Sequence, residues 1–113
     1  MRLQVLLQNG EMNKIKVFIS SVQSEFSDER KMLYEYLTTD ALLGRFFEPF
    51  IFEALPAKDQ KADLAYLEKV RQSDIYLGIF GKEYGSEDKN GISPTEKEFN
   101  LARKENKTRL IFI

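Results

Sequence analysis

The 113-residue sequence contains no cysteine and no histidine. Without cysteine there is no disulfide framework, no thiol nucleophile and no zinc–thiolate site. Without histidine, the Ser-His-Asp triad, the usual proton shuttle near neutral pH and imidazole metal ligands are all excluded. One loop, at residues 86–97, faintly resembles a calcium site, but Ser86 and Lys97 stand where acidic ligands should be. We therefore predict no metal site, and any chemistry has to use carboxylates, hydroxyls, lysine, arginine or tyrosine.

Long apolar runs and an excess of one charge are also missing. No apolar run approaches the roughly 20 residues that a bilayer-spanning helix needs, so we expect no membrane segment. The formal net charge of −1 supplies no general field to attract phosphate backbones, and we expect no direct nucleic-acid binding. A hydrophobic content of 42% and a charged content of 31% are typical of a soluble globular domain, compatible with the cytoplasm. We read residues 1–13 as an N-terminal appendage and residues 14–113 as a single domain.

From Lys14 onward, short β-rich apolar runs alternate with segments of helical period. The expected strands are 15–20, 48–54, 75–80 and 108–113, and the expected helices are 24–39, 61–72 and 93–106. This alternation predicts an α/β fold: a doubly wound, mainly parallel open sheet of about four strands, with helices on both faces. The last apolar strand has no helix after it, so we expect a truncated fold, cut from a longer polypeptide or completed by another chain.

Polar and glycine residues follow the predicted strands at the edge where open parallel sheets bind ligands. The ligand-binding candidates are Ser20, Ser21, Glu53, Gly81, Tyr84, Gly85 and Ser93. Ser20 and Ser21 have two readings. They are small residues that turn the chain and cap the next helix, or their hydroxyls hold a phosphate or ribose.

Arg30 shares the apolar stripe of the first helix with Leu33 and Leu37. Burying an unpaired guanidinium would cost several kcal/mol, so the position predicts a partner. Glu53 and Asp74 are the candidate partners in a structural ion pair, and a ligand anion is the third. Snorkelling of the side chain to solvent is the alternative.

Two glutamates of the third helix can be separated by their positions. Ser93, Pro94 and Glu96 fit a capping box at the helix start, so Glu96 has a sufficient structural role. Glu98 lies further into the helix, beside Phe99. Glu98 has two interpretations. It is a carboxylate near aromatic rings, with a raised pKa or a role as a nucleophile, or it is a solvated surface glutamate.

Several motifs together resemble one known family. They are "VFISSVQSEFSDER", "FE" before "ALPA", "SDIYLGIFGKEYG" and "SPTEKEFNLA", and the resemblance to the bacterial domain of unknown function numbered four-zero-six-two spans residues 16–113. Members of this family usually form the N-terminal domain of larger proteins. The family in turn looks similar to Toll/interleukin-receptor (TIR) domains and nucleoside 2-deoxyribosyltransferases, which implies a flavodoxin-like, TIR-like topology. "EFNLA" resembles the transferase pattern whose glutamate acts at the anomeric carbon, which implies Glu98 as catalytic residue, although Asn100 replaces the usual glycine.

Two functions follow as hypotheses. The first is a sensor or protein-interaction domain at the N-terminus of a larger bacterial regulatory protein, with downstream domains or a second copy as partners. The second is an enzyme that processes N-glycosidic bonds of NAD or a nucleoside, since one carboxylate can stabilise an oxocarbenium-like state without histidine or metal. In that case Glu98 acts on the sugar, Ser20 and Ser21 bind phosphate or ribose, Tyr84 contacts the base and Glu53 orients a hydroxyl. No cofactor is implied beyond NAD or a nucleoside as ligand or substrate.

Overall fold

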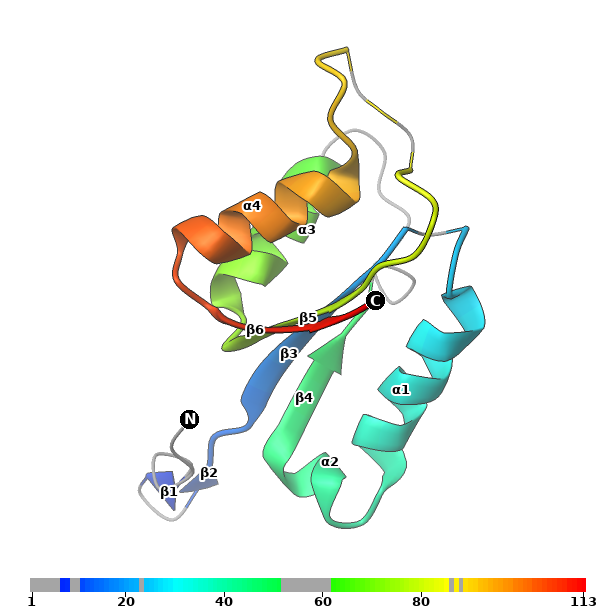
Figure 1. The fold of residues 1–113 in the computed structure, drawn as a ribbon. Helices are drawn as coiled ribbons and strands as arrows, with labels where there is room; N and C mark the ends of the chain where they lie inside the picture. Colours follow the sequence, from blue (N-terminus) through cyan, green and yellow to red (C-terminus); the bar gives the residue numbers. More distant parts are fainter. Residues whose placement is uncertain (1–6, 9–10, 23, 52–61, 86, 88) are drawn as a thin grey trace.

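The computed structural model describes residues 7–8, 11–22, 24–51, 62–85, 87 and 89–113 (Figure 1). The strands are β1 (Leu7–Gln8), β2 (Glu11–Met12), β3 (Ile15–Ser20), β4 (Phe47–Phe50), β5 (Ile75–Ile79) and β6 (Thr108–Phe112). The helices are α1 (Ser27–Thr39), α2 (Leu43–Phe46), α3 (Ala62–Gln72) and α4 (Pro94–Lys104). None of the helices in these described ranges is long and apolar enough to cross a membrane.

The main sheet has four strands in the order β4-β3-β5-β6, and every neighbouring pair is parallel. Val17 of β3 lies opposite Pro49 of β4 and Ile75 of β5, and Ile75 lies opposite Thr108 of β6. The predicted open parallel sheet of four strands is therefore confirmed. β1 and β2 form a separate antiparallel pair before it. The assignment of residues 1–13 as an appendage stays a prediction.

The two faces of the sheet are covered by different helices because successive side chains of a strand point to opposite sides. Ile15, Val17 and Ile19 of β3 belong to a buried cluster against which residues of α1 pack. Phe18 lies on the other face and forms a second cluster with Tyr76, Val70 of α3 and Ala102 of α4. Figure 1 shows α1 on one side of the sheet and α3 with α4 on the other, as expected for a doubly wound fold.

The boundaries of the helices differ from the expected ones at informative places. α1 begins at Ser27 rather than at residue 24, because Phe26 adopts a left-handed conformation with φ of 59° and ends a tight loop. α2 is missing from the sequence prediction, since four residues are too few to carry a periodic signal. α4 begins at Pro94 with Ser93 as its N-cap, which confirms the predicted start.

β6 is an edge strand, and its five residues are all exposed. Leu110 and Phe112 keep 45% and 58% of their surface accessible. β6 pairs with β5 on one side and lies at the edge of the sheet. Because its side chains are exposed along the whole strand, it is the strand of the main sheet that the described helices cover least. The expectation that another segment or chain completes this edge stays a prediction.

Candidate functional site

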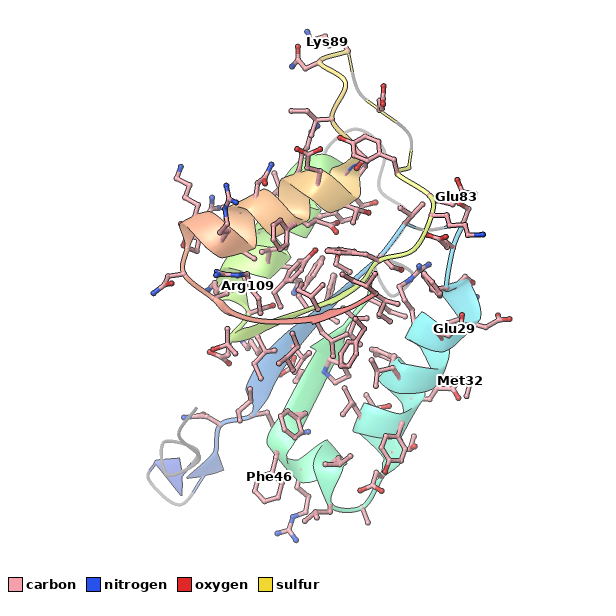
Figure 2. The ribbon with its side chains drawn as sticks, viewed as in Figure 1. Glu29, Met32, Phe46, Glu83, Lys89 and Arg109 are labelled. Carbon is pink, nitrogen blue, oxygen red and sulfur yellow. The ribbon has the colours of Figure 1, made fainter. Side chains whose placement is uncertain are left out.

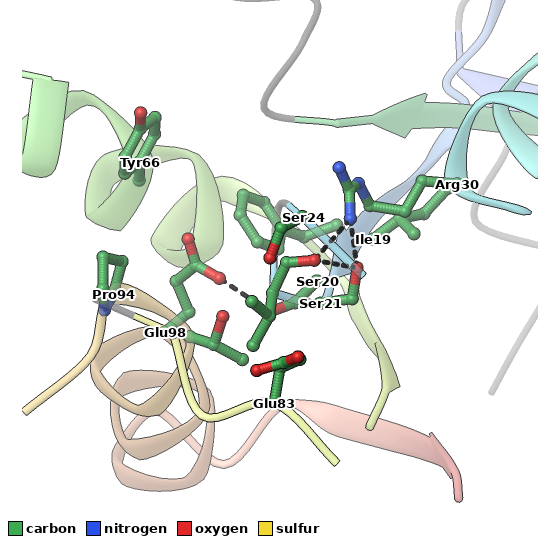
Figure 3. Close-up of a pocket in the computed structure, with 13 residues that line it drawn as sticks. Ile19, Ser20, Ser21, Ser24, Arg30, Tyr66, Glu83, Pro94 and Glu98 are labelled. Atoms are coloured by element: carbon green, nitrogen blue, oxygen red, sulfur yellow. Dashed lines mark hydrogen bonds between the residues drawn. The ribbon is translucent and has the colours of Figure 1, made fainter. Parts of the chain in front are cut away.

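A pocket of about 700 Å³ lies at the carboxyl end of β3 (Figure 3). Its walls come from the end of β3 and the loop after it, from α1, from α3, from the loop after β5 and from the first turns of α4. The described lining residues are Phe18, Ile19, Ser20, Ser21, Val22, Ser24, Arg30, Tyr66, Glu83, Gly85, Pro94, Thr95 and Glu98. This is the edge of the sheet where ligands of open α/β folds bind.

Ser20 and Glu98 meet in the wall of the pocket formed by α4. The Ser20 hydroxyl donates a hydrogen bond of 2.6 Å to Oε1 of Glu98, although the residues are 78 positions apart. Both are buried, with 2% and 7% of their surfaces exposed. Glu98 therefore does not point into bulk water, and the hydroxyl of Ser20 holds one of its oxygens beside the pocket.

Ser21 points to the opposite side, towards α1, where it meets Arg30. The Nη1 atom of Arg30 donates to the Ser21 hydroxyl (Figure 3). The same atom donates, at 2.9 Å each, to the backbone carbonyls of Val22 and Glu25. Arg30 is 2% exposed, so it does not snorkel to solvent. The arginine on the apolar stripe thus binds backbone oxygens and fixes the loop between β3 and α1.

The predicted pairing of Arg30 with Asp74 needs correction. Asp74 precedes β5 at the amino end of the sheet, where its carboxylate accepts a 2.8 Å hydrogen bond from the amide of Lys16. Its own amide donates to the Lys16 carbonyl, also at 2.8 Å. Arg30 binds the loop beyond the other end of β3, so the two side chains are separated by the length of that strand. Glu53, the other predicted partner, lies outside the described residues.

Tyr84 and Ser93 organise the start of α4. The Ser93 hydroxyl accepts a 3.2 Å hydrogen bond from the amide of Glu96, which is the first half of the predicted capping box. In place of the return bond, the Ser93 amide donates to the Tyr84 hydroxyl at 3.3 Å, and that hydroxyl binds Glu96. The hydrogen bond to Glu96 raises the pKa of Tyr84 above its usual value. Neither Tyr84 nor Ser93 lines the pocket, and the expected contact of Tyr84 with a base stays a prediction.

The two predicted glycines have different positions. Gly85 lines the pocket, and its φ of 98° is a conformation that favours glycine. Gly81 does not line the pocket but lies against the side chains of Glu25 and Phe26. Of the predicted ligand-binding residues that the structure describes, Ser20, Ser21 and Gly85 therefore share the pocket with Glu98.

Sequence reasoning missed Tyr66, Glu83 and Thr95 as lining residues. Tyr66 is 6% exposed and stands four positions before the buried Val70, so helical spacing was a usable signal for it. Glu83 and Thr95 lie on the loop after β5 and at the start of α4, where nothing in the sequence indicates which way a side chain points.

Tyr76 was also missed as a polar neighbour of the site. It is fully buried on the face of Ser20, and its hydroxyl lies near that of Ser20 but makes no well-formed hydrogen bond with the described residues. Burial raises the pKa of this hydroxyl far above its usual value, the hydroxyl of Ser20 opposes the rise and the negative charge of Glu98 adds to it. The run "IYLGIF" reads as a uniformly apolar strand, so the hydroxyl of Tyr76 was not considered as a polar group.

The pocket is lined mainly by groups that can donate or accept hydrogen bonds. A buried carboxylate, three serine hydroxyls and a threonine face one cavity, with a tyrosine and a phenylalanine as apolar walls. Within the described part of the chain, no group of three or more acidic, cysteine or histidine residues could hold a metal ion. The pocket thus offers hydrogen-bonding groups together with the negative charges of Glu83 and Glu98 and the positive charge of Arg30.

These observations define an α/β domain with an open parallel sheet and a polar pocket at the carboxyl end of a central strand. A family model described as Domain of unknown function (DUF4062) matches residues 16–113, and the chain belongs to this family. The match confirms the family resemblance that the sequence motifs indicate. A comparison with curated proteins found no match.

Proposed function

We propose that this domain binds a nucleoside- or nucleotide-like small molecule in the pocket beside Ser20 and Glu98. In this proposal it acts as the N-terminal sensor or interaction domain of a larger cytoplasmic bacterial regulatory protein. The observation that carries it is the buried hydrogen bond from Ser20 to Glu98, which places a carboxylate in the wall of the cavity.

Size and chemistry support a ligand of this class. Sites for small molecules usually have volumes of about 300 to 1,000 Å³, with apolar walls and a few convergent polar groups. Here the rings of Phe18 and Tyr66 supply apolar surface, while Glu98 and the serines supply acceptors and donors. A flat base suits the rings, and the hydroxyls of a ribose suit the carboxylate and the serines.

The proposal is tested by titrating the protein with adenosine, AMP and NAD while following backbone amides by nuclear magnetic resonance. At least one probe should bind, with the largest shifts at Ser20, Ser21 and Glu98. Glu98→Gln, which keeps the volume but removes the charge, should weaken binding at least about tenfold, corresponding to about 1.4 kcal/mol. The control is Glu105→Gln, because Glu105 is an exposed carboxylate at the far end of the same helix. Shifts confined to other surfaces, or no binding at millimolar concentration, would contradict the proposal.

A second function is favoured by one observation, the burial of Glu98 in the cavity wall. Cleavage of an N-glycosidic bond passes through an oxocarbenium-like state, and a carboxylate in a site of limited water access stabilises such charge more strongly than in bulk solvent. In this alternative Glu98 attacks or stabilises the anomeric carbon, and Ser20 orients its carboxylate.

Turnover separates the two functions. NAD, adenosine and deoxyadenosine are incubated with the protein and the release of free base is measured. An enzyme should lose at least about a hundredfold in rate on Glu98→Gln, whereas Glu105→Gln should leave the rate unchanged. If the substrates are recovered intact while binding is measurable, the domain is a sensor and the catalytic assignment of Glu98 is wrong.

A further inference from the structure

The loop between β3 and α1 and the loop between β5 and α4 meet beside the pocket, to which both contribute lining residues. The carboxylate of Glu25, on the first loop, accepts hydrogen bonds from two consecutive amides of the second. The Lys82 amide lies 2.9 Å from Oε2, and the Glu83 amide lies 3.2 Å from each oxygen. Two neighbouring N–H groups that converge on one anion form a small nest, and hydrogen bonds to an ionised acceptor are about twice as strong as neutral ones.

The backbone of Glu25 is itself fixed by hydrogen bonds. Its amide donates to the Val22 carbonyl at 3.0 Å, and its carbonyl accepts a 2.9 Å hydrogen bond from the buried Arg30. The backbone of Glu25 is thereby anchored to α1, and its side chain spans the gap to the second loop. A side chain anchored at its base loses less conformational freedom when its carboxylate binds.

Gly81 permits this contact. A Cβ atom at position 81 would lie 2.6 Å from Oε2 of Glu25 and 2.7 Å from the ring of Phe26. Both distances are far below an ordinary contact, so with a larger residue at position 81 the side chains of Glu25 and Phe26 or the second loop would have to shift, and the present contact would be disturbed. Glycine at position 81 therefore leaves room for the Glu25 carboxylate to bind the amides of residues 82 and 83.

Both loops contribute to the pocket. Val22 and Ser24 line it from the first loop, and Glu83 and Gly85 line it from the second. One of the two amides that Glu25 binds belongs to Glu83, whose side chain stands at the pocket in Figure 3. We propose that Glu25 is a positioning residue that fastens the two loops together and so sets the shape of the rim through which a ligand enters. This inference rests on the proposed ligand-binding function and adds a control of access to it.

The fastening is tested first without ligand, by amide hydrogen exchange in the folded protein. Glu25→Gln removes the charge and keeps one acceptor oxygen, and Glu25→Ala removes the whole carboxylate. Gly81→Ala disturbs the contact by crowding it while the Glu25 carboxylate remains. All three should speed exchange at Lys82 and Glu83, by at least about tenfold in Glu25→Ala, the factor that corresponds to losing about 1.4 kcal/mol. Glu29→Gln is the matched control, because Glu29 projects into solvent from the first turn of α1 (Figure 2).

The positioning role is tested by the dissociation rate of whichever probe, adenosine, AMP or NAD, binds the wild-type protein. Glu25→Ala should release it at least about tenfold faster, and Glu29→Gln should match the wild type. Unchanged exchange at Lys82 and Glu83 would overturn the fastening, and faster exchange with unchanged dissociation would overturn the positioning role. If the wild type binds no probe, the ligand-binding function fails and the positioning role fails with it. The exchange result then shows separately whether the fastening exists.

Discussion

Replacing Arg30 by methionine removes the donor that holds the loop between β3 and α1, while most of the side-chain volume is kept. Three acceptors lose their bond to Nη1: the Ser21 hydroxyl and the carbonyls of Val22 and Glu25. A buried acceptor that loses its partner costs about 1 to 3 kcal/mol. Ser21 and Val22 line the pocket, so water replaces part of the loss there. We therefore expect Arg30→Met to lower the free energy of unfolding by about 3 to 5 kcal/mol, the sum of three such losses reduced by the partial replacement with water.

This is a large share of the roughly 5 to 15 kcal/mol that holds an ordinary domain folded, so the effect is readily measured. Urea unfolding followed by far-ultraviolet circular dichroism gives the free energy for the wild type and the variant. Arg71→Ala is the control, because Arg71 is half-exposed and forms a 3.0 Å salt bridge with Glu68 that is worth less than about 1 kcal/mol. If Arg30→Met costs no more than Arg71→Ala, the loop does not depend on the guanidinium and the reasoning is refuted.

Substitutions at two further positions test the burial of Tyr76 and the left-handed residue after α4. Tyr76→Phe removes a buried hydroxyl that has no partner among the described residues, so it should raise the free energy of unfolding by about 1 kcal/mol at neutral pH. The folded-state pKa of Tyr76 is raised, so the stability tied to its proton is present below the ordinary value of about 10 and is lost above it. Urea unfolding at pH values above about 10 should show the free energy of unfolding of the wild type falling by about 1.4 kcal/mol per pH unit more than that of Tyr76→Phe. A variant that is less stable than the wild type at neutral pH would instead show that the hydroxyl is hydrogen-bonded. Asn106 has a φ of 56° in an exposed turn after α4, so Asn106→Gly should stabilise the domain by up to about 1 kcal/mol and Asn106→Val should destabilise it by a similar amount. Equal melting temperatures for the two Asn106 variants would contradict this.

The sheet was predictable because its signals are local. "IKVFIS" and "IYLGIF" are short β-rich runs separated by segments of helical period, and this alternation constrains a chain to a parallel sheet with helices on both faces. Burial of Arg30 was predictable for the same reason, since its spacing to Leu33 and Leu37 places all three on one face of α1. α2 was not predictable, because a helix of four residues is determined by its surroundings.

The partners of the buried polar groups were much harder to predict. Arg30 binds two backbone carbonyls, and carbonyls are present at every position, so residue identity gives no indication of which ones it meets. Asp74 directly precedes the predicted strand 75–80, so in a parallel sheet it belongs at the amino end, and its predicted pairing with Arg30 overlooked this signal. Tyr84 belongs to a loop near the pocket, and its hydroxyl accepts a hydrogen bond from the Ser93 amide at the start of α4. This contact joins two separate segments, so the sequence around Tyr84 does not indicate it.

The neighbouring serines show how one pocket depends on both layers of the fold. Ser20 meets Glu98 on the side of α4, whereas Ser21 meets Arg30 on the side of α1. The two contacts differ in what they support. Arg30 binds the backbone of the loop, so its loss changes the position of several lining residues together. Glu98 binds a side chain, and a glutamine at this position can still accept from Ser20 at almost unchanged volume. A loss of binding or turnover in Glu98→Gln is therefore attributable to the missing charge, whereas the same loss in an Arg30 variant would not separate chemistry from architecture.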